Sequence, residues 1–152
     1  LRETRFFAVV QLGRLARYLR LLGFDTLFVR DIDDVDLVRQ AVAERRIVLT
    51  RDRDLLMRRA VTHGCPIRQG DPGAQRRYVV ARCDLTGSVH PFTRCMACND
   101  LLDPVRKAAI LDQLEPITRD AFHDFWRCRG CGRIYWKGSH FEKLQDLIDA
   151  VL

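Results

Sequence analysis

The sequence lacks several features that define whole classes of protein. It has no apolar run that approaches the roughly 20 residues of a membrane-spanning helix, which excludes an integral membrane protein. Residues 1–5 show no apolar core of the kind that a signal peptide carries. No internal repeat and no low-complexity tract occurs. We therefore expect a soluble globular protein.

Lysine is scarce, and arginine carries the positive charge. The chain has 3 Lys against 23 Arg and a net charge of +6. Residues 1–82 hold 17 basic and 10 acidic side chains, whereas residues 83–152 hold 9 and 10. Guanidinium groups bind phosphate bidentately, so an arginine-rich half favours a nucleic-acid partner. A genome that prefers arginine codons gives the same composition, so both explanations stay open.

The length suits one compact domain, or a domain with a small appendix. The chain has 152 residues, of which 47% are hydrophobic and 30% charged. Position 1 is Leu rather than Met, so we expect a fragment of a longer protein.

Residues 1–84 alternate short apolar runs with amphipathic segments. The predicted strands are 5–10, 26–29, 47–50 and 65–68, and the predicted helices are 12–22, 33–44, 52–61 and 72–81. This alternation is typical of βαβ units and a parallel sheet. Ligands of such sheets bind beyond the carboxyl ends of the strands. We therefore expect the chemistry at residues 9–12, 29–34 and 50–54.

A break at residues 86–91 predicts two parts, residues 1–84 and residues 92–152. The second part carries two cysteine pairs, each with two intervening residues: Cys95, Cys98, Cys128 and Cys131. Four thiolates at this spacing close a tetrahedral Zn²⁺ shell, so we expect a structural zinc. Disulfides or a redox dithiol are the alternatives.

The other two cysteines, Cys65 and Cys83, are unpaired by spacing and are expected to be small core residues. Free thiols without a signal peptide predict a cytoplasmic protein. Between the cysteine pairs, Asp103-Pro104 predicts a helix over residues 103–111. Residues 125–127 and 134–136 predict a hairpin, and Ser139 to Glu142 form a capping box before a final amphipathic helix.

Four segments occur in one order along the chain: LGRLARYLR at residues 12–20, IVLTRDR at 47–53, the two cysteine pairs, and YWKGSH at 135–140. Together they resemble the Mut-seven C-terminal RNase domain family over about residues 5–150. The resemblance implies an α/β fold, with a PIN-like parallel sheet flanked by helices and a C-terminal zinc ribbon. It also implies a ribonuclease that acts on RNA with Mg²⁺ or Mn²⁺. In some bacterial members this domain follows a ubiquitin-like domain, so such a domain in the same or another chain is an implied partner.

The resemblance also implies which acids hold the catalytic metal. Asp34 matches the acid at the start of the second helix, and Asp52 matches the acid of the Thr-Arg-Asp motif. Asp33 and Asp54 are their neighbours in the sequence. At the end of the first strand Val9 replaces the acid that the family pattern requires, and valine cannot ligate a metal. We therefore expect an impaired ribonuclease or, alternatively, a non-catalytic RNA-binding or protein-interaction module.

Structural explanations compete with these functional ones. An Asp that precedes a helix is common as an N-cap, which accounts for Asp34 and Asp52 equally well. Arg14, Arg17 and Arg20 lie opposite the apolar face of their predicted helix, where they either bind RNA phosphates or face water.

Aromatic residues and one histidine of the second part raise the same question. Trp126, Tyr135 and Trp136 either stack on RNA bases or pack a small core. His140 either supports the turn before the last helix or reaches the RNA.

Overall fold

The computed structural model describes residues 3–57 and 63–150, and for Ser139, His140 and Leu147 it describes the backbone alone. Its first lobe is built on a parallel sheet with the strand order β2-β1-β3-β4. The strands are β1 (Arg5–Ala8), β2 (Asp25–Phe28), β3 (Ile47–Thr50) and β4 (Gly64–Pro66). The sequence predicted each of them, because strands covered on both faces are apolar along their whole length.

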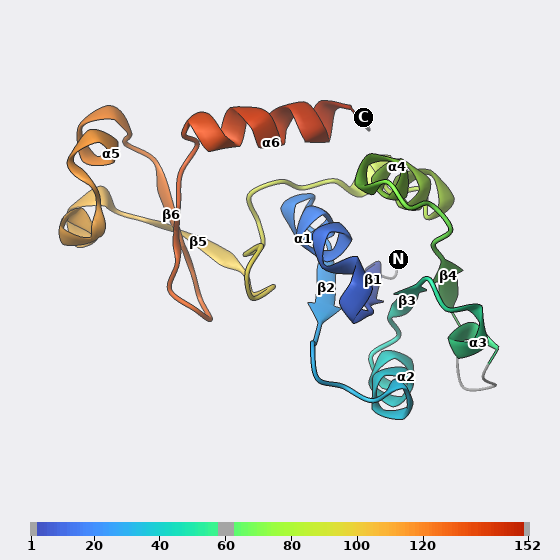
Figure 1. Cartoon of the computed structure of the whole chain (residues 1–152). Helices are drawn as coiled ribbons and strands as arrows, with labels where there is room; N and C mark the ends of the chain where they lie inside the picture. The colour runs from blue at the N-terminus through green and yellow to red at the C-terminus, as the bar shows by residue number, and fades with distance from the viewer. Residues whose placement is uncertain (1–2, 58–62, 151–152) are drawn as a thin grey trace.

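Helices cover both faces of this sheet (Figure 1). One face carries α1 (Gly13–Leu21) and α4 (Pro72–Arg82), and the other carries α2 (Asp34–Ala43) and α3 (Arg53–Leu56). Leu15 and Leu19 of α1 are buried, as the helical periodicity predicted. The α/β fold class is therefore confirmed. No helix in the described part of the chain is long and apolar enough to cross a bilayer.

The first strand and the third helix end earlier than predicted. β1 stops at Ala8 because the Val9 carbonyl accepts a hydrogen bond from the Leu12 N–H and opens a 3-10 turn, η1 (Val10–Leu12). α3 ends at Leu56, and residues 58–61 of its predicted range lie outside the described residues.

The second module follows a short 3-10 turn, η2 (Thr86–Ser88), and contains an antiparallel sheet. Its strands are β5 (Leu102–Val105), β6 (Phe125–Cys128) and β7 (Ile134–Tyr135), in that order. The predicted hairpin is thereby confirmed. Two further 3-10 turns, η3 (Lys107–Ala109) and η4 (Leu111–Gln113), and one short helix, α5 (Pro116–Ala121), lie between β5 and β6.

The helix predicted over residues 103–111 is wrong. Asp103 and Pro104 belong to β5 and pair with Arg127 and Trp126 of β6. An Asp-Pro pair is typical of a helix start, but proline is also tolerated on an edge strand, where one side of the backbone needs no partner. β5 is such an edge strand.

The last helix, α6 (Ser139–Asp149), returns from the second module to the first lobe (Figure 1). Its N-cap is Gly138 rather than the predicted Ser139. Ile148 is 1% exposed and belongs to the apolar core of the first lobe, against which Leu144 also packs. If the chain is divided at residues 86–91, α6 belongs to the second part in sequence but packs against the core of the first.

Candidate functional site

The carboxyl edge of the parallel sheet is where the topology predicts a ligand. The connections from β1 and β2 run to opposite sides of the sheet, so the strand order reverses at β1. The register pairs Ala8 with Leu49, and the Val9 N–H donates to the Leu49 carbonyl at 3.1 Å. Residue 9 therefore lies beside the end of β3, as expected for neighbouring strands.

A cavity of about 730 Å³ opens at this edge, and we call it the carboxyl-edge cavity. Its lining includes the first turn of α1 and the exposed side chains of Arg14, Arg17 and Arg30. No side chain caps the N-terminus of α1, so its first N–H groups and its dipole favour an anion. The cavity is therefore suited to a phosphate group.

Arg20 does not belong to the exposed arginine stripe that the sequence predicted. Its side chain is 5% exposed, and burial lowers the pKa of its guanidinium group. Its Nε donates to the Thr26 carbonyl at 2.9 Å, and Nη1 donates to the carbonyls of Met96 at 3.0 Å and Ala97 at 3.2 Å. Helical periodicity identified the polar face of α1 but could not show that the second module covers part of it.

The four acids predicted as metal ligands are exposed at the starts of α2 and α3. Asp33 is the N-cap of α2 and Asp34 its first residue, so the capping position predicted for Asp34 belongs to Asp33. Asp52 is the N-cap of α3, where its Oδ1 accepts from the Asp54 N–H at 2.9 Å. The capping alternative is thus confirmed for Asp52. Its predicted catalytic role stays a prediction, as do those of Asp33, Asp34 and Asp54.

The donor set at this edge does not fit a Mg²⁺ or Mn²⁺ site built from three or more carboxylates. Among the residues that the structure describes, only cysteines form a group of three or more metal-ligating side chains with ligand atoms within 4.8 Å of one another. Val9 is 8% exposed and packs into the apolar core. These hard cations need oxygen ligands, which a valine side chain does not have.

The cysteine group in the second module does fit zinc. The Sγ atoms of Cys95, Cys98, Cys128 and Cys131 lie within 4.8 Å of one another. The Cys98–Cys128 separation is 3.3 Å and the Cys95–Cys131 separation is 3.7 Å. Zn–S bonds of about 2.3 Å in a tetrahedron place sulfurs roughly 3.8 Å apart, so the predicted ligands can hold a zinc ion.

Hydrogen bonds around the sulfurs support this assignment. The Cys131 N–H donates to Cys128 Sγ at 3.4 Å, and Arg133 Nη1 donates to Cys131 Sγ at 3.6 Å. Although burial acts to raise it, hydrogen bonds from Arg133 lower the pKa of the Cys131 thiol to about 6. The Tyr135 hydroxyl lies 2.9 Å from Cys95 Sγ. Such contacts orient thiolate ligands and stabilise their negative charge.

Asn99 joins this centre to the parallel sheet, and sequence reasoning missed it. Its Oδ1 accepts from the Thr26 N–H of the edge strand β2 at 2.9 Å, and its Nδ2 donates to Asp25 Oδ1 at 2.7 Å. Asp25 also pairs with Arg46 at 2.7 Å. A φ of +76° at Asn99 is typical of an Asn in a turn, and that preference was the available signal. Its hydrogen-bond partners, Thr26 and Asp25, are more than 70 residues away in the sequence, so no local pattern could indicate them.

The three aromatic candidates are all half-buried. Trp126 packs edge-on against Phe92 with ring centroids 4.7 Å apart, as the packing alternative predicted. Trp136 also packs against the buried Phe125, with ring centroids 6.2 Å apart, so the packing alternative holds for it too. Tyr135 and Trp136 line a further cavity. The side chain of His140 lies outside the described residues.

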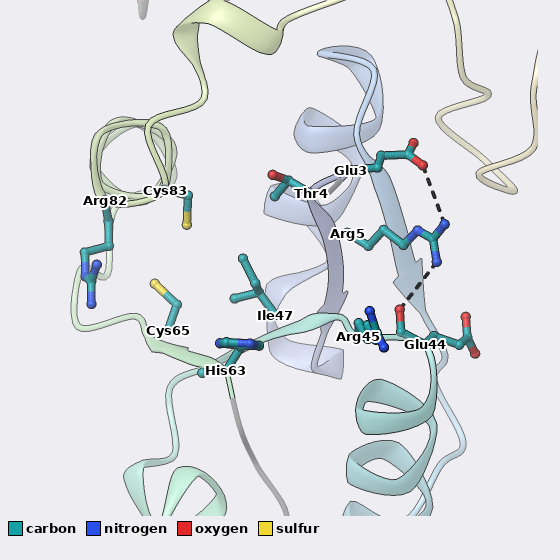
Figure 2. Close-up of a pocket in the computed structure, with 11 residues that line it drawn as sticks. Glu3, Thr4, Arg5, Glu44, Arg45, Ile47, His63, Cys65, Arg82 and Cys83 are labelled. Carbon is teal, nitrogen blue, oxygen red and sulfur yellow. Dashed lines mark hydrogen bonds and ion pairs between the residues drawn. The ribbon is translucent and has the colours of Figure 1, made fainter. Parts of the chain in front are cut away.

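A cavity of about 690 Å³ lies at the opposite edge, where the strands begin (Figure 2). Cys65 and Cys83 point toward one another there, and the proximity of the Cys83 thiol lowers the pKa of Cys65 to about 7. Cys65 belongs to the apolar core, and Cys83 packs against it, as predicted for both. None of the predicted catalytic or RNA-binding residues lines this cavity.

Comparison with known families agrees with this architecture. The family model of the Mut7-C RNAse domain matches residues 4–148, nearly the whole chain, which confirms the resemblance. Neither a curated protein nor a solved structure matches the chain with significance. The match covers both the parallel sheet and the cysteine group. The chain therefore belongs to the Mut7-C RNAse domain family, and this membership supports a nuclease-like function.

Proposed function

We propose that this chain binds RNA at the carboxyl edge of its parallel sheet and hydrolyses it only weakly. The observation that carries the proposal is the carboxyl-edge cavity, in which Arg14, Arg17 and Arg30 surround the uncapped N-terminus of α1. Membership of an RNase domain family supplies RNA as the substrate class.

The arginine side chains and the N-terminus of α1 both attract a phosphate group. Arg14 and Arg17 are three residues apart on α1, so their side chains leave the helix on one face. Each guanidinium can donate two parallel hydrogen bonds to one phosphate group. The N–H groups at the start of α1 add a partial positive charge at the same place. These contacts read the backbone of a nucleic acid rather than its sequence.

The expected weakness of hydrolysis follows from the position of Val9. β1 is flanked by β2, which leads to Asp34, and by β3, which leads to Asp52. An acid at residue 9 would follow the strand that lies between these two strands. Val9 leaves the edge one carboxylate short of what the family pattern requires. RNA binding does not need that carboxylate, whereas metal-dependent cleavage does.

Binding of a labelled single-stranded RNA, measured by fluorescence anisotropy at several salt concentrations without divalent metal, tests this proposal. We expect the double variant Arg14→Ala/Arg17→Ala to bind about tenfold more weakly at low salt, because charge-assisted hydrogen bonds are lost. The plot of log K against log salt should become shallower, with its negative slope smaller in magnitude by about 1.4, since each phosphate contact on a single strand contributes about 0.7.

A matched control separates a local effect from loss of charge. Arg39→Ala/Arg106→Ala removes the same two positive charges from exposed positions that line neither the carboxyl-edge cavity nor the cavity of Figure 2. Equal loss of affinity in both double variants would contradict the proposed site, and absence of RNA binding by the native chain would contradict the function itself.

A further inference from the structure

A further cavity, also of about 730 Å³, lies between α1 and the second module, with α5 and α6 contributing to its walls. Five of the residues that line it are aromatic: Phe92, Phe122, Tyr135, Trp136 and Phe141. We call it the aromatic cleft. Its rings come from four different segments of the chain, so folding rather than sequence neighbourhood brings them together.

Contacts with neighbouring side chains hold several of these rings in place. Phe92 meets Phe141 edge-on at 4.9 Å between centroids, and the Lys137 ammonium lies 5.7 Å from the Phe92 ring and 5.4 Å from the Phe141 ring. Trp136 packs closely against Gly138. A Cβ atom at position 138 would lie only 2.8 Å from the Trp136 Nε1, so the contact depends on the absence of a side chain there. Rings fixed in this way lose little conformational entropy when a flat ligand stacks on them.

Three arginines line the cleft, Arg17, Arg94 and Arg133, and none of its described lining residues is acidic. Two of them also have negatively charged partners: Arg94 lies 3.5 Å from Glu3 and 4.0 Å from Asp25, and Arg133 donates to Cys131 Sγ. Arg17 and Ala97 also line the carboxyl-edge cavity, so the two cavities meet at these residues. A ligand that contacts Arg17 with one group can therefore place another group in the aromatic cleft.

We propose that the aromatic cleft receives a nucleobase of the RNA strand whose phosphates contact Arg14 and Arg17, an inference that rests on the proposed function. A single-stranded nucleic acid alternates a phosphate with a flat aromatic base, and the two adjoining cavities offer arginines and aromatic rings in the same succession. Proteins that bind single strands combine a basic path for the backbone with rings on which bases stack. The continuity through Arg17 and the absence of acidic lining residues favour RNA over an apolar peptide or a second copy of this chain.

Two RNAs of equal length and charge test the inference in the full chain with its metal. One is an ordinary single-stranded RNA, and the other carries abasic sites at its central positions. The native chain should bind the abasic RNA about tenfold more weakly with the same salt slope. Trp136→Ala should lose about tenfold affinity for the ordinary RNA and none for the abasic RNA. Trp136→Phe, which keeps a stacking ring, should retain most of the affinity.

Tryptophan emission gives a second readout. The chain has two tryptophans, and Trp126 does not line the cleft, so Trp126→Phe leaves Trp136 as the only emitter. Ordinary RNA should quench this emission at saturation, and abasic RNA should not. This measurement keeps the inference testable even where Trp136→Ala fails to fold.

The outcomes separate this inference from the proposed function. Equal affinity of the native chain for both RNAs, with a steep salt dependence, overturns the base site and leaves RNA binding intact. Equal losses for both RNAs in Trp136→Ala assign Trp136 a structural role and overturn the inference. A change in Trp136 emission with protein concentration alone assigns the cleft to a second copy. Failure to bind either RNA overturns the proposed function and the base site together.

Discussion

The parallel-sheet lobe and the cysteine-bearing module differ in how much apolar surface each buries. The lobe encloses one large core, in which Phe6, Phe7 and Leu49 are 0% exposed. Among the described residues, the module's own buried cluster is Ile110, Leu114 and Phe125, with four partly buried hydrophobic residues packed against it. So small a core rarely stabilises a fold alone, and metal binding is a common substitute. Packing therefore stabilises the first half of the chain, and we predict that a metal ion bound to the four cysteines stabilises the second.

Removal of zinc should have the largest effect, and it should be confined to one region. Cys128→Ser, or a strong chelator, should unfold the module and spare most of the parallel sheet. Structural zinc contributes roughly 10–16 kcal/mol in small zinc-binding peptides at neutral pH, which is large beside the burial that so small a cluster provides. Elemental analysis for zinc, together with amide NMR spectra of both regions, measures this.

Leu49→Ala perturbs the other region, the sheet lobe, because Leu49 is 0% exposed in its core. It should destabilise the lobe by about 2–5 kcal/mol and leave the zinc content at one ion per chain. A module that stays folded without any metal would contradict the comparison.

The contact between the two regions should matter less than either interior. Asn99→Ala removes two hydrogen bonds, one to the Thr26 N–H and one to Asp25 Oδ1. Leaving buried polar groups without partners costs about 1–3 kcal/mol, so urea unfolding should show a loss of that size with zinc retained. An Asn99→Ala variant as stable as the native chain would show that the regions are held together by α6 instead.

A smaller effect is expected from pH at the same contact. Burial acts to raise the pKa of Asp25, but hydrogen bonds from Arg46 and Asn99 outweigh it and hold that pKa below its ordinary value of 3.8. The ion pair therefore stabilises the fold fully above the unfolded-state pKa and loses that contribution as the pH falls through the folded-state pKa.

Thermal unfolding between pH 7 and pH 3 checks this. The difference in Tm between the native chain and Asp25→Asn should be constant near neutrality and should shrink below about pH 4, where unfolded Asp protonates. Comparing the two proteins at each pH cancels any zinc release that both undergo. A difference that grows as the pH falls would contradict the sign of the pKa shift.

Local features of the fold were predictable from the sequence, and contacts between its two regions were not. Strand and helix periodicity identified the parallel sheet, and cysteine spacing identified the four side chains that the fold brings together and that can hold a metal, because both signals come from local patterns in the sequence. The burial of Arg20 and the link through Asn99 depend on where the second module packs. The helix predicted at Asp103-Pro104 failed because pairing with β6 outweighed a local helix-start preference.

Candidate catalytic acids show the same limit more sharply. Sequence placed Asp34 and Asp52 at the carboxyl edge, which the topology bears out, since each stands where a strand leads into a helix. Whether such carboxylates converge depends on side-chain geometry that no spacing rule contains. The substitution at Val9 was readable directly, because a residue that cannot bind metal is visible in the sequence itself.

Cleavage of RNA by the native chain and by Val9→Asp, each with Mn²⁺ and with Mg²⁺, tests the central claim most directly. The claim is that the carboxyl edge is the site of action on RNA and that a missing carboxylate after β1 limits hydrolysis. It predicts cleavage near background for the native chain, a metal-dependent gain for Val9→Asp, and loss of that gain when Asp52→Asn is added. Brisk cleavage by the native chain, or no gain from a folded Val9→Asp variant with either metal, would contradict it.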